Sequence, residues 1–170
     1  MARFIPEILC TLVVLILQVV IAPAIGIGYG LPNFVLAFCV AFAVASQRTN
    51  VVVMPFLAGL AFDLLSTGPV GGFALLCLVA SGAAALLYAR MDNDTLFIPL
   101  ACICICILGA EVLYACICVT CGWHVGLGEA LLYRSLPNFL YDTVIALVMY
   151  PLLRLLLRRT SGSAEMPSIG

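Results

Sequence analysis

Long runs of apolar residues dominate the chain, and short breaks rich in Gly, Pro, Asn and Asp separate them. Six runs reach or approach the ~20 residues that a helix needs to cross a bilayer, with about 17 as the lower limit. They cover residues 5–25, 31–46, 50–66, 71–89, 96–121 and 130–153. The breaks are of the kind that ends helices. The pattern therefore predicts one all-α domain of six transmembrane helices, residues 1–159, and a disordered cytoplasmic tail over residues 160–170.

The composition places the chain among integral membrane proteins. Hydrophobic residues make up 65% of the 170 residues and charged residues only 9%, whereas a soluble domain carries ~25% charged residues. The mean hydropathy is +1.27. The first apolar run follows Arg3, as in a signal peptide, but no small-x-small cleavage site with a polar region comes after it. We therefore expect residues 5–25 to be the first transmembrane helix.

The arginines predict which side of the membrane each loop occupies. All seven basic residues are Arg. With a cytoplasmic N-terminus, Arg134 is the exception, and six arginines obey the positive-inside rule: Arg3, Arg48, Arg90, Arg154, Arg158 and Arg159. We therefore expect a multi-pass protein with both termini in the cytoplasm.

Once the loops are assigned, four charged residues remain at membrane depth, away from the ends of the first span: Asp63, Glu111, Arg134 and Asp142. A charge at the centre of a bilayer costs ~2.5–3.5 kcal/mol on insertion scales, so such groups usually face the helix bundle and have a partner. A rise of about 1.5 Å per residue puts the first three near one outer level and Asp142 about 12 Å deeper. We expect Arg134 to pair with Asp63 or Glu111, and Asp142 to be hydrogen-bonded elsewhere or protonated.

Three interpretations of this charge cluster stay open on the sequence alone. It is a buried ion pair that fixes helix register, a ligand or proton site, or a charge that faces another membrane protein. A proton pathway needs acidic groups at several depths of the membrane, and only Asp142 lies deep.

The nine cysteines do not form a metal or redox pattern. In CICICI, Cys102 and Cys106 share a helix face while Cys104 points away, so three thiolates cannot converge on zinc. The CxxC spacing of Cys118 and Cys121 has no second pair and no thioredoxin-like context. Buried cysteine behaves as a small apolar residue, and we expect no bound metal and no cofactor.

The usual catalytic motifs are missing from the sequence. It contains no P-loop, no HExxH and no GxSxG, so we expect no enzymatic activity. The tetrapeptide LPNF occurs twice, at residues 31–34 and 136–139. Because Pro removes a backbone donor and Asn can satisfy a freed backbone group, we expect a bend at Pro137.

The stretch FLAGLAFDLLSTGPVGGFALL resembles the hallmark of the MreD family, the rod shape-determining membrane proteins. The hallmark reads G-L-x-x-D-L-L-x-x-x-P-x-G, and a Pro-Asn pair begins the preceding span. The residues that carry the resemblance are Pro32, Asn33, Gly59, Asp63, Gly68, Pro69 and Gly71. A basic inside loop, YARMD, fits the same family.

The resemblance implies a non-enzymatic scaffold for bacterial cell elongation and peptidoglycan synthesis in the cytoplasmic (inner) membrane. Members work with an MreC-like bitopic protein, with a RodA-type glycosyltransferase paired with a class B penicillin-binding protein, and indirectly with MreB filaments. The lipid bilayer is the remaining expected partner, and no nucleic acid is expected. The resemblance also implies the six-helix fold of the substrate-binding (S) components of energy-coupling-factor transporters.

That implied fold makes a vitamin-binding S component the alternative function. S components resemble one another in an Ala-xxx-Ala patch on the first span, where this chain has the bulky sequence ILCTLVVLILQVVIAPA. A third hypothesis is a proton-coupled transporter or channel subunit, for which the sequence offers too few aligned polar groups.

The residues of the hallmark give Asp63 a physical role. Gly59 allows a neighbouring helix to approach closely, as small residues do in membranes. The STGPVGG turn is tight because Pro presets φ and Gly accepts strained angles. We therefore expect Asp63 to find a donor in a protein-lined position and to serve packing and orientation at the outer face of the bundle.

Overall fold

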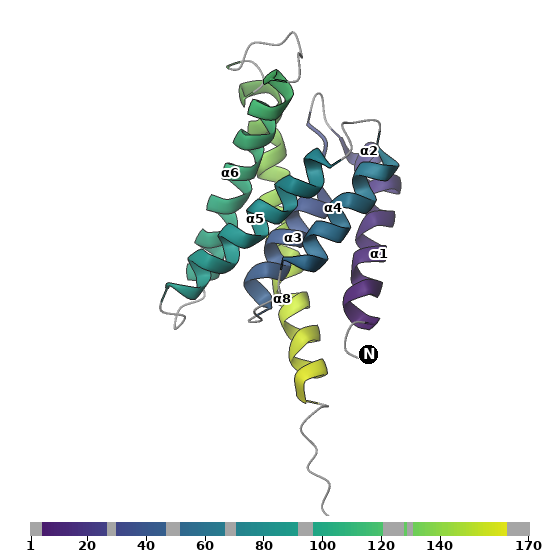
Figure 1. The fold of residues 1–170 in the computed structure, drawn as a ribbon, viewed down its shortest axis with the longest axis vertical. Helices are drawn as coiled ribbons and strands as arrows, with labels where there is room; N and C mark the ends of the chain where they lie inside the picture. Colours follow the sequence, from purple (N-terminus) through teal and green to yellow (C-terminus); the bar gives the residue numbers. More distant parts are fainter. Residues whose placement is uncertain are drawn as a thin grey trace, which may run out of the picture.

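The computed structural model is an all-α bundle that describes residues 5–26, 30–46, 52–66, 71–91, 97–120, 128 and 131–162. Its elements, drawn in Figure 1, are α1 (Ile5–Val20), α2 (Ala22–Ile25), α3 (Phe34–Ala45), α4 (Val53–Leu65), α5 (Gly72–Ala89), α6 (Phe97–Thr120), the π-helix η1 (Leu131–Ser135) and α8 (Leu136–Gly162). Each predicted span thus contains helix.

Helix length divides these elements into two groups. Three helical stretches are long and apolar enough to cross a membrane: Gly72–Ala89, Phe97–Thr120 and Leu136–Leu157. Three more are apolar but shorter: Pro6–Val20, Phe34–Ala45 and Val53–Leu65. These lengths and compositions are those of a membrane protein.

Several boundaries differ from the predicted ones for local reasons. The first run is divided, because α1 ends at Val20 and α2 restarts with a Pro in its first turn. The helix type changes next to Pro137, since η1 ends at Ser135 and α8 begins at Leu136, and the expected bend stays a prediction. The α8 helix continues to Gly162, because its run of Leu and Arg favours helix. The first residues of the expected tail are therefore helical.

The core of the bundle is α3. Every residue from Val35 to Val44 is at most 3% exposed, and α3 packs against α1, α4, α5, α6 and α8. Its 12 residues span about 18 Å, less than the ~30 Å hydrocarbon core of a bilayer. A helix enclosed by other helices does not have to reach the headgroups. Its ends then need protein partners for their backbone groups, because lipid offers none.

The bundle has two distinct ends in Figure 1. The first helix begins and α8 ends at the lower end, where α6 also begins. The starts of α3 and α5 and the π-helix η1 lie at the opposite, upper end. The polar side chains described next gather at the upper end.

Candidate functional site

Polar side chains surround the point at which the chain enters α3. Gln18 of α1 contacts the backbone on both sides of Asn33. Its Nε2 donates to the Pro32 carbonyl at 3.2 Å, and its Oε1 accepts from the Phe34 amide at 2.6 Å. The Asn33 side chain itself accepts from the Leu36 amide at 3.2 Å and caps the helix. Gln18 therefore ties α1 to the start of α3.

Side chains of α8 hold the same stretch from another direction. The Leu31 amide donates to Asn138 Oδ1 at 2.9 Å, and the Asn33 amide donates to Asp142 Oδ1 at 2.6 Å. Asn138 and Asp142 share one face of α8 because they stand one helical turn apart, and both are buried. The second LPNF copy thus supplies the Asn that binds the backbone of the first copy.

Together, these four side chains form a structural unit that we call the α3 anchor: Gln18, Asn33, Asn138 and Asp142. The first amides of a helix have no acceptor within that helix, and a lipid environment cannot supply one. A buried donor left without a partner costs about 1–3 kcal/mol. The α3 anchor meets this requirement with groups from α1 and α8, so the start of α3 and the positions of both helices depend on one another.

Glu111 of α6 extends the α3 anchor towards η1. Its buried carboxyl group lies in electrostatic contact with Arg134, Asn138 and Asp142. Its backbone carbonyl accepts from Ser135 Oγ at 3.4 Å. Among the described residues, no donor reaches Asp142 Oδ2, and Glu111 is an acidic neighbour of that carboxyl group. Two carboxyl groups and one guanidinium therefore meet between α6, η1 and α8.

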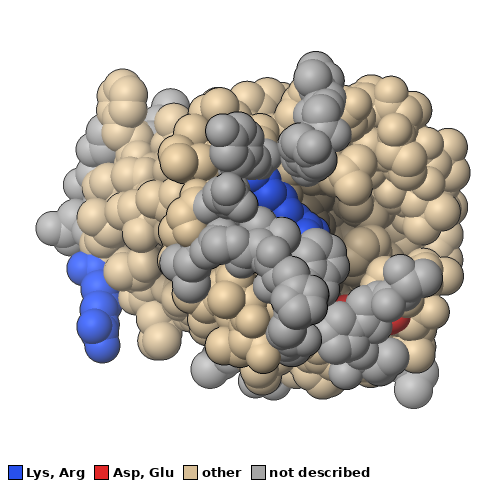
Figure 2. Space-filling model, turned by 90° about the horizontal axis from the view of Figure 1, so that it is seen from above, with Lys and Arg blue, Asp and Glu red and all other residues tan. Residues whose placement is uncertain are grey.

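Aromatic rings connect Arg134 with the α4–α5 hairpin. The guanidinium lies over the Tyr114 ring, 5.2 Å from its centroid, which is a cation–π geometry. Tyr114 meets Phe73 edge to face at 6.3 Å, and Phe73 packs on Phe62 at 4.9 Å. Figure 2 shows the molecule from above, with a described surface that is mostly uncharged, basic side chains near the middle and at the left edge of the view, and a small acidic area at the lower right.

Asp63 lies near the end of α4 and binds the first turn of α5. Its Oδ2 accepts from the Gly71 amide at 2.8 Å and from the Ala74 amide at 3.0 Å. Gly71 has a φ of 95°, which only glycine adopts readily. The carboxylate caps α5, where the helix dipole also favours negative charge. The donors that Asp63 meets are therefore backbone amides of the next helix.

Gly59 lies where α4 touches α5. A Cβ atom at this position would be 2.8 Å from Ala74 Cα and 3.1 Å from Cys77 Cβ. Since the nearest atom belongs to the backbone, a side chain here would force the two helices apart. Of the other hallmark positions, Pro32 is buried, and Gly68 and Pro69 lie outside the described residues.

The predicted charge cluster has two sets of partners. Glu111, Arg134 and Asp142 share one neighbourhood, whereas Asp63 binds α5. Of the two carboxyl groups expected near Arg134, Glu111 is in electrostatic contact with it. Asp142 is hydrogen-bonded to the Asn33 amide, which was one of the two expectations for it.

Sequence reasoning does not single out Gln18 or Glu7, and it points to Asn138 only as the Asn of the second LPNF copy. Asn138 and Glu7 are buried and Gln18 is half-buried. The signal that was available is a polar residue within an apolar run. It does not say which backbone group each side chain meets. The partners of Gln18 and Asn138 lie up to 16 and 107 residues away.

The described cysteines are all free thiols, and Cys121 lies outside the described residues. Cys102 and Cys106 are both buried and Cys104 is less so, as the helical spacing predicts. In the part of the chain that the structure describes, no three His, Cys, Asp or Glu side chains are placed to hold a metal ion.

Comparison with known protein families decides the identity of this bundle. The model of the family "rod shape-determining protein MreD" matches residues 2–160. The chain belongs to the MreD family. Membership gives it a role in rod shape determination, and MreD proteins are not a known family of enzymes. This match confirms the family that the hallmark suggested, and it extends over nearly the whole chain. No curated protein and no solved structure matches the chain, so the likeness to S components stays a prediction.

Proposed function

We propose that this MreD-family protein is a non-enzymatic scaffold of the cell-elongation machinery that crosses the bacterial cytoplasmic membrane six times. Both termini lie in the cytoplasm in this proposal. Its support is the fold, because α1 begins and α8 ends at the same lower end in Figure 1. Arg90 follows the lower end of α5, and Arg154 lies in the last part of α8, as the positive-inside rule requires of the cytoplasmic side.

The observation that carries the scaffold proposal is the direction of the hydrogen bonds in the α3 anchor. Gln18, Asn138 and Asp142 all bind the backbone of residues 31–34. These hydrogen bonds fix α1 and α8 around the buried helix α3. A protein that assembles other membrane proteins needs a fixed helix arrangement, and these bonds provide one.

The proposed partners are an MreC-like bitopic protein, a RodA-type glycosyltransferase with a class B penicillin-binding protein, and indirectly MreB. All but MreB present transmembrane helices. Such helices can pack on apolar faces that the bundle leaves exposed, for example on α1 and on α8, where Leu9, Leu12, Leu140 and Val144 are each more than half exposed.

Depletion of the protein in its own host tests the scaffold proposal. Rod-shaped cells are expected to become round, and an MreC-like protein is expected to co-purify with the tagged chain. An Asp63→Leu variant should insert normally but lose partner binding or helix register, since α5 loses its cap. Normal rods after depletion, or equal co-purification and cell shape in that variant, would contradict the proposal.

The topology has a separate test. A green fluorescent protein fused after residue 170 should fluoresce, because it folds in the cytoplasm. An alkaline phosphatase fused at the same place should be inactive. The opposite pair of results would invert the proposed orientation.

A further inference from the structure

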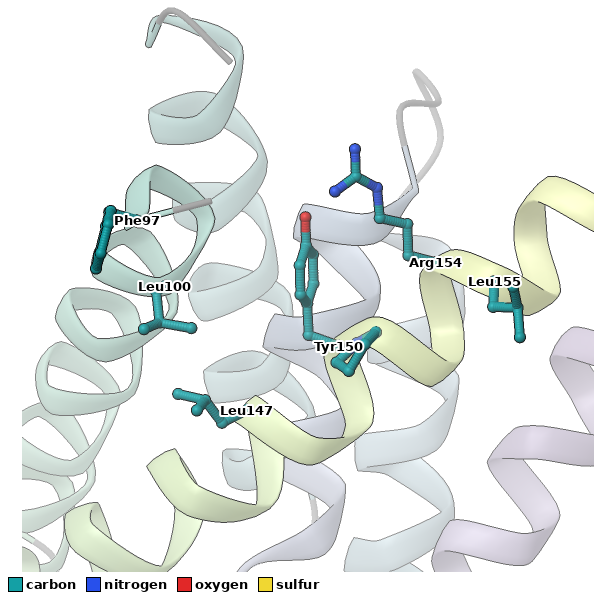
Figure 3. A pocket seen from close by; sticks show the side chains of 7 residues that line it. Phe97, Leu100, Leu147, Tyr150, Arg154 and Leu155 are labelled. Carbon is teal, nitrogen blue, oxygen red and sulfur yellow. The ribbon is translucent and has the colours of Figure 1, made fainter. Parts of the chain in front are cut away.

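A groove of about 500 Å³ lies between α6 and α8 at the lower end of the bundle. Its walls are mainly apolar, with Phe97 and Leu100 on α6 and Leu147 and Leu155 on α8, and its polar groups are Tyr150 and Arg154. Figure 3 shows Leu100 and Leu147 projecting into the space between the two helices. It also shows the Tyr150 hydroxyl and the Arg154 guanidinium rising to the same side of α8.

The groove lies at an edge of the apolar part of the bundle. The candidate span of α6 starts at Phe97, and that of α8 ends at Leu157. Arg154 is therefore within one turn of the end of its apolar stretch, and Phe97, which is 78% exposed, stands at the start of its own. An Arg at this depth reaches the headgroup region while its stem stays among apolar groups.

The polar side of the groove has a defined chemistry. The Tyr150 hydroxyl lies beside the Arg154 guanidinium and beside Tyr88 of α5, in electrostatic contact with both. Tyr150 and Tyr88 are buried, so these groups are held in place by packing. A guanidinium next to a fixed hydroxyl is an arrangement that binds phosphate oxygens.

We propose that this groove binds an anionic phospholipid, with its phosphate on Arg154 and Tyr150 and an acyl chain against Leu100 and Leu147. Charge complementarity favours this occupant. An apolar partner helix would cover the walls but bring no anion to Arg154, whereas an anionic lipid supplies a phosphate for Arg154 and an acyl chain for the apolar walls. Basic pockets between transmembrane helices on the cytoplasmic side bind anionic headgroups in this way. The inference goes beyond the scaffold function and takes from that proposal only the cytoplasmic placement of the lower end.

Native mass spectrometry of the full-length chain tests the proposal. The protein is extracted from vesicles of equal phosphatidylglycerol and phosphatidylcholine, and the retained lipids are counted. We expect phosphatidylglycerol to be retained over phosphatidylcholine. Arg154→Gln should lower that retention about tenfold or more, because it removes a charged hydrogen bond to the phosphate, and Arg154→Lys should keep part of it.

Matched variants separate the groove from general attraction. Arg90→Gln removes an exposed Arg at the same end, and Leu152→Trp enlarges an exposed side chain of α8 outside the groove. Both are expected to leave lipid retention unchanged, whereas Leu147→Trp should fill the groove and displace the lipid. Thermal unfolding of each variant shows that it is folded.

Three results would overturn the assignment. Equal retention of the two lipids would remove the anion preference, and equal losses in Arg90→Gln and Arg154→Gln would mean non-specific attraction. A polyprenyl phosphate in place of a phospholipid, among the lipids that remain after purification from host membranes, would name a different occupant. Because these assays use purified protein without partners, their failure would leave the cell-shape tests untouched.

Discussion

Asp63 and Asp142 have the same chemistry at two helix starts, but their partners lie at very different distances along the chain. Each carboxyl group accepts backbone amides where a helix begins, Asp63 for α5 and Asp142 for α3. Asp63 reaches Gly71 over eight residues, whereas Asp142 reaches Asn33 over 109 residues. One bond closes a hairpin, and the other joins the two halves of the chain.

The two carboxyl groups also differ in their surroundings. Asp63 uses Oδ2 twice, for Gly71 and Ala74. Asp142 uses Oδ1 once, and no donor among the described residues reaches its Oδ2, beside Glu111. Among the described residues, the carboxylate hydrogen bonds of Asp63 involve only α4 and the start of α5. The long-range contact depends on how α6 and α8 are packed, so a disturbance at Asp142 should spread further through the bundle.

The largest effect is expected for Asp142→Leu. The substitution leaves the partly buried Asn33 amide without its acceptor and removes a hydrogen bond between α8 and the start of α3. The free energy of unfolding should fall by about 3 kcal/mol, as measured by equilibrium unfolding in mixed micelles. Hydrogen exchange should rise across residues 31–37 and in α8. Unchanged hydrogen exchange at residues 31–37 would mean that Asp142 does not hold the start of α3.

Gln18→Leu should have the next largest effect. It removes the acceptor of the Phe34 amide and the donor of the Pro32 carbonyl, which should cost about 2 kcal/mol. In the double variant with Asp142→Leu, the loss should be smaller than the sum of the two single losses, because both side chains hold the same turn. Strictly additive losses would mean that α1 and α8 act on α3 independently.

Asp63→Ala is expected to cost less and to act locally. Loss of a helix cap costs about 1 kcal/mol, and amide exchange should increase at residues 71–75. Exchange at residues 31–37 should stay as in the wild type. Asp63→Asn keeps an acceptor oxygen and is the matched control. If Asp63→Ala loosened the start of α3 as well, the distinction between local and long-range contacts would fail.

The smallest effect is expected for Thr120→Val. The Thr120 hydroxyl is exposed, and among the described residues it bonds carbonyls of its own helix, those of Cys116 and Ile117. Its loss should change the free energy of unfolding by less than about 0.5 kcal/mol. A drop as large as that of Asp63→Ala would show that any polar deletion destabilises this bundle to the same degree.

The same distinction explains how much could be predicted from the sequence. Apolar runs and their breaks are local properties, so the helical segments could be located, as could the close contact of Gly59. The donors of Asp63 lie in the turn and helix that directly follow α4, so the sequence could predict that Asp63 has a donor, though not which group it is. The acceptor role of Asp142 for Asn33 could not, because it depends on how α8 packs on α3. The shortness of α3 likewise follows from its enclosure by other helices.

In the proposed function, the buried polar groups at the upper end hold the helices of the scaffold in place. The most direct test is Asp142→Asn, which keeps an acceptor for the Asn33 amide and removes the carboxyl group's charge and proton. We expect near-wild-type unfolding, co-purification of the MreC-like protein, and rods in cells that carry only this variant. A variant that unfolds as the wild type does, yet leaves the cells round, would contradict the proposal, because the carboxyl group would then have a chemical role of its own.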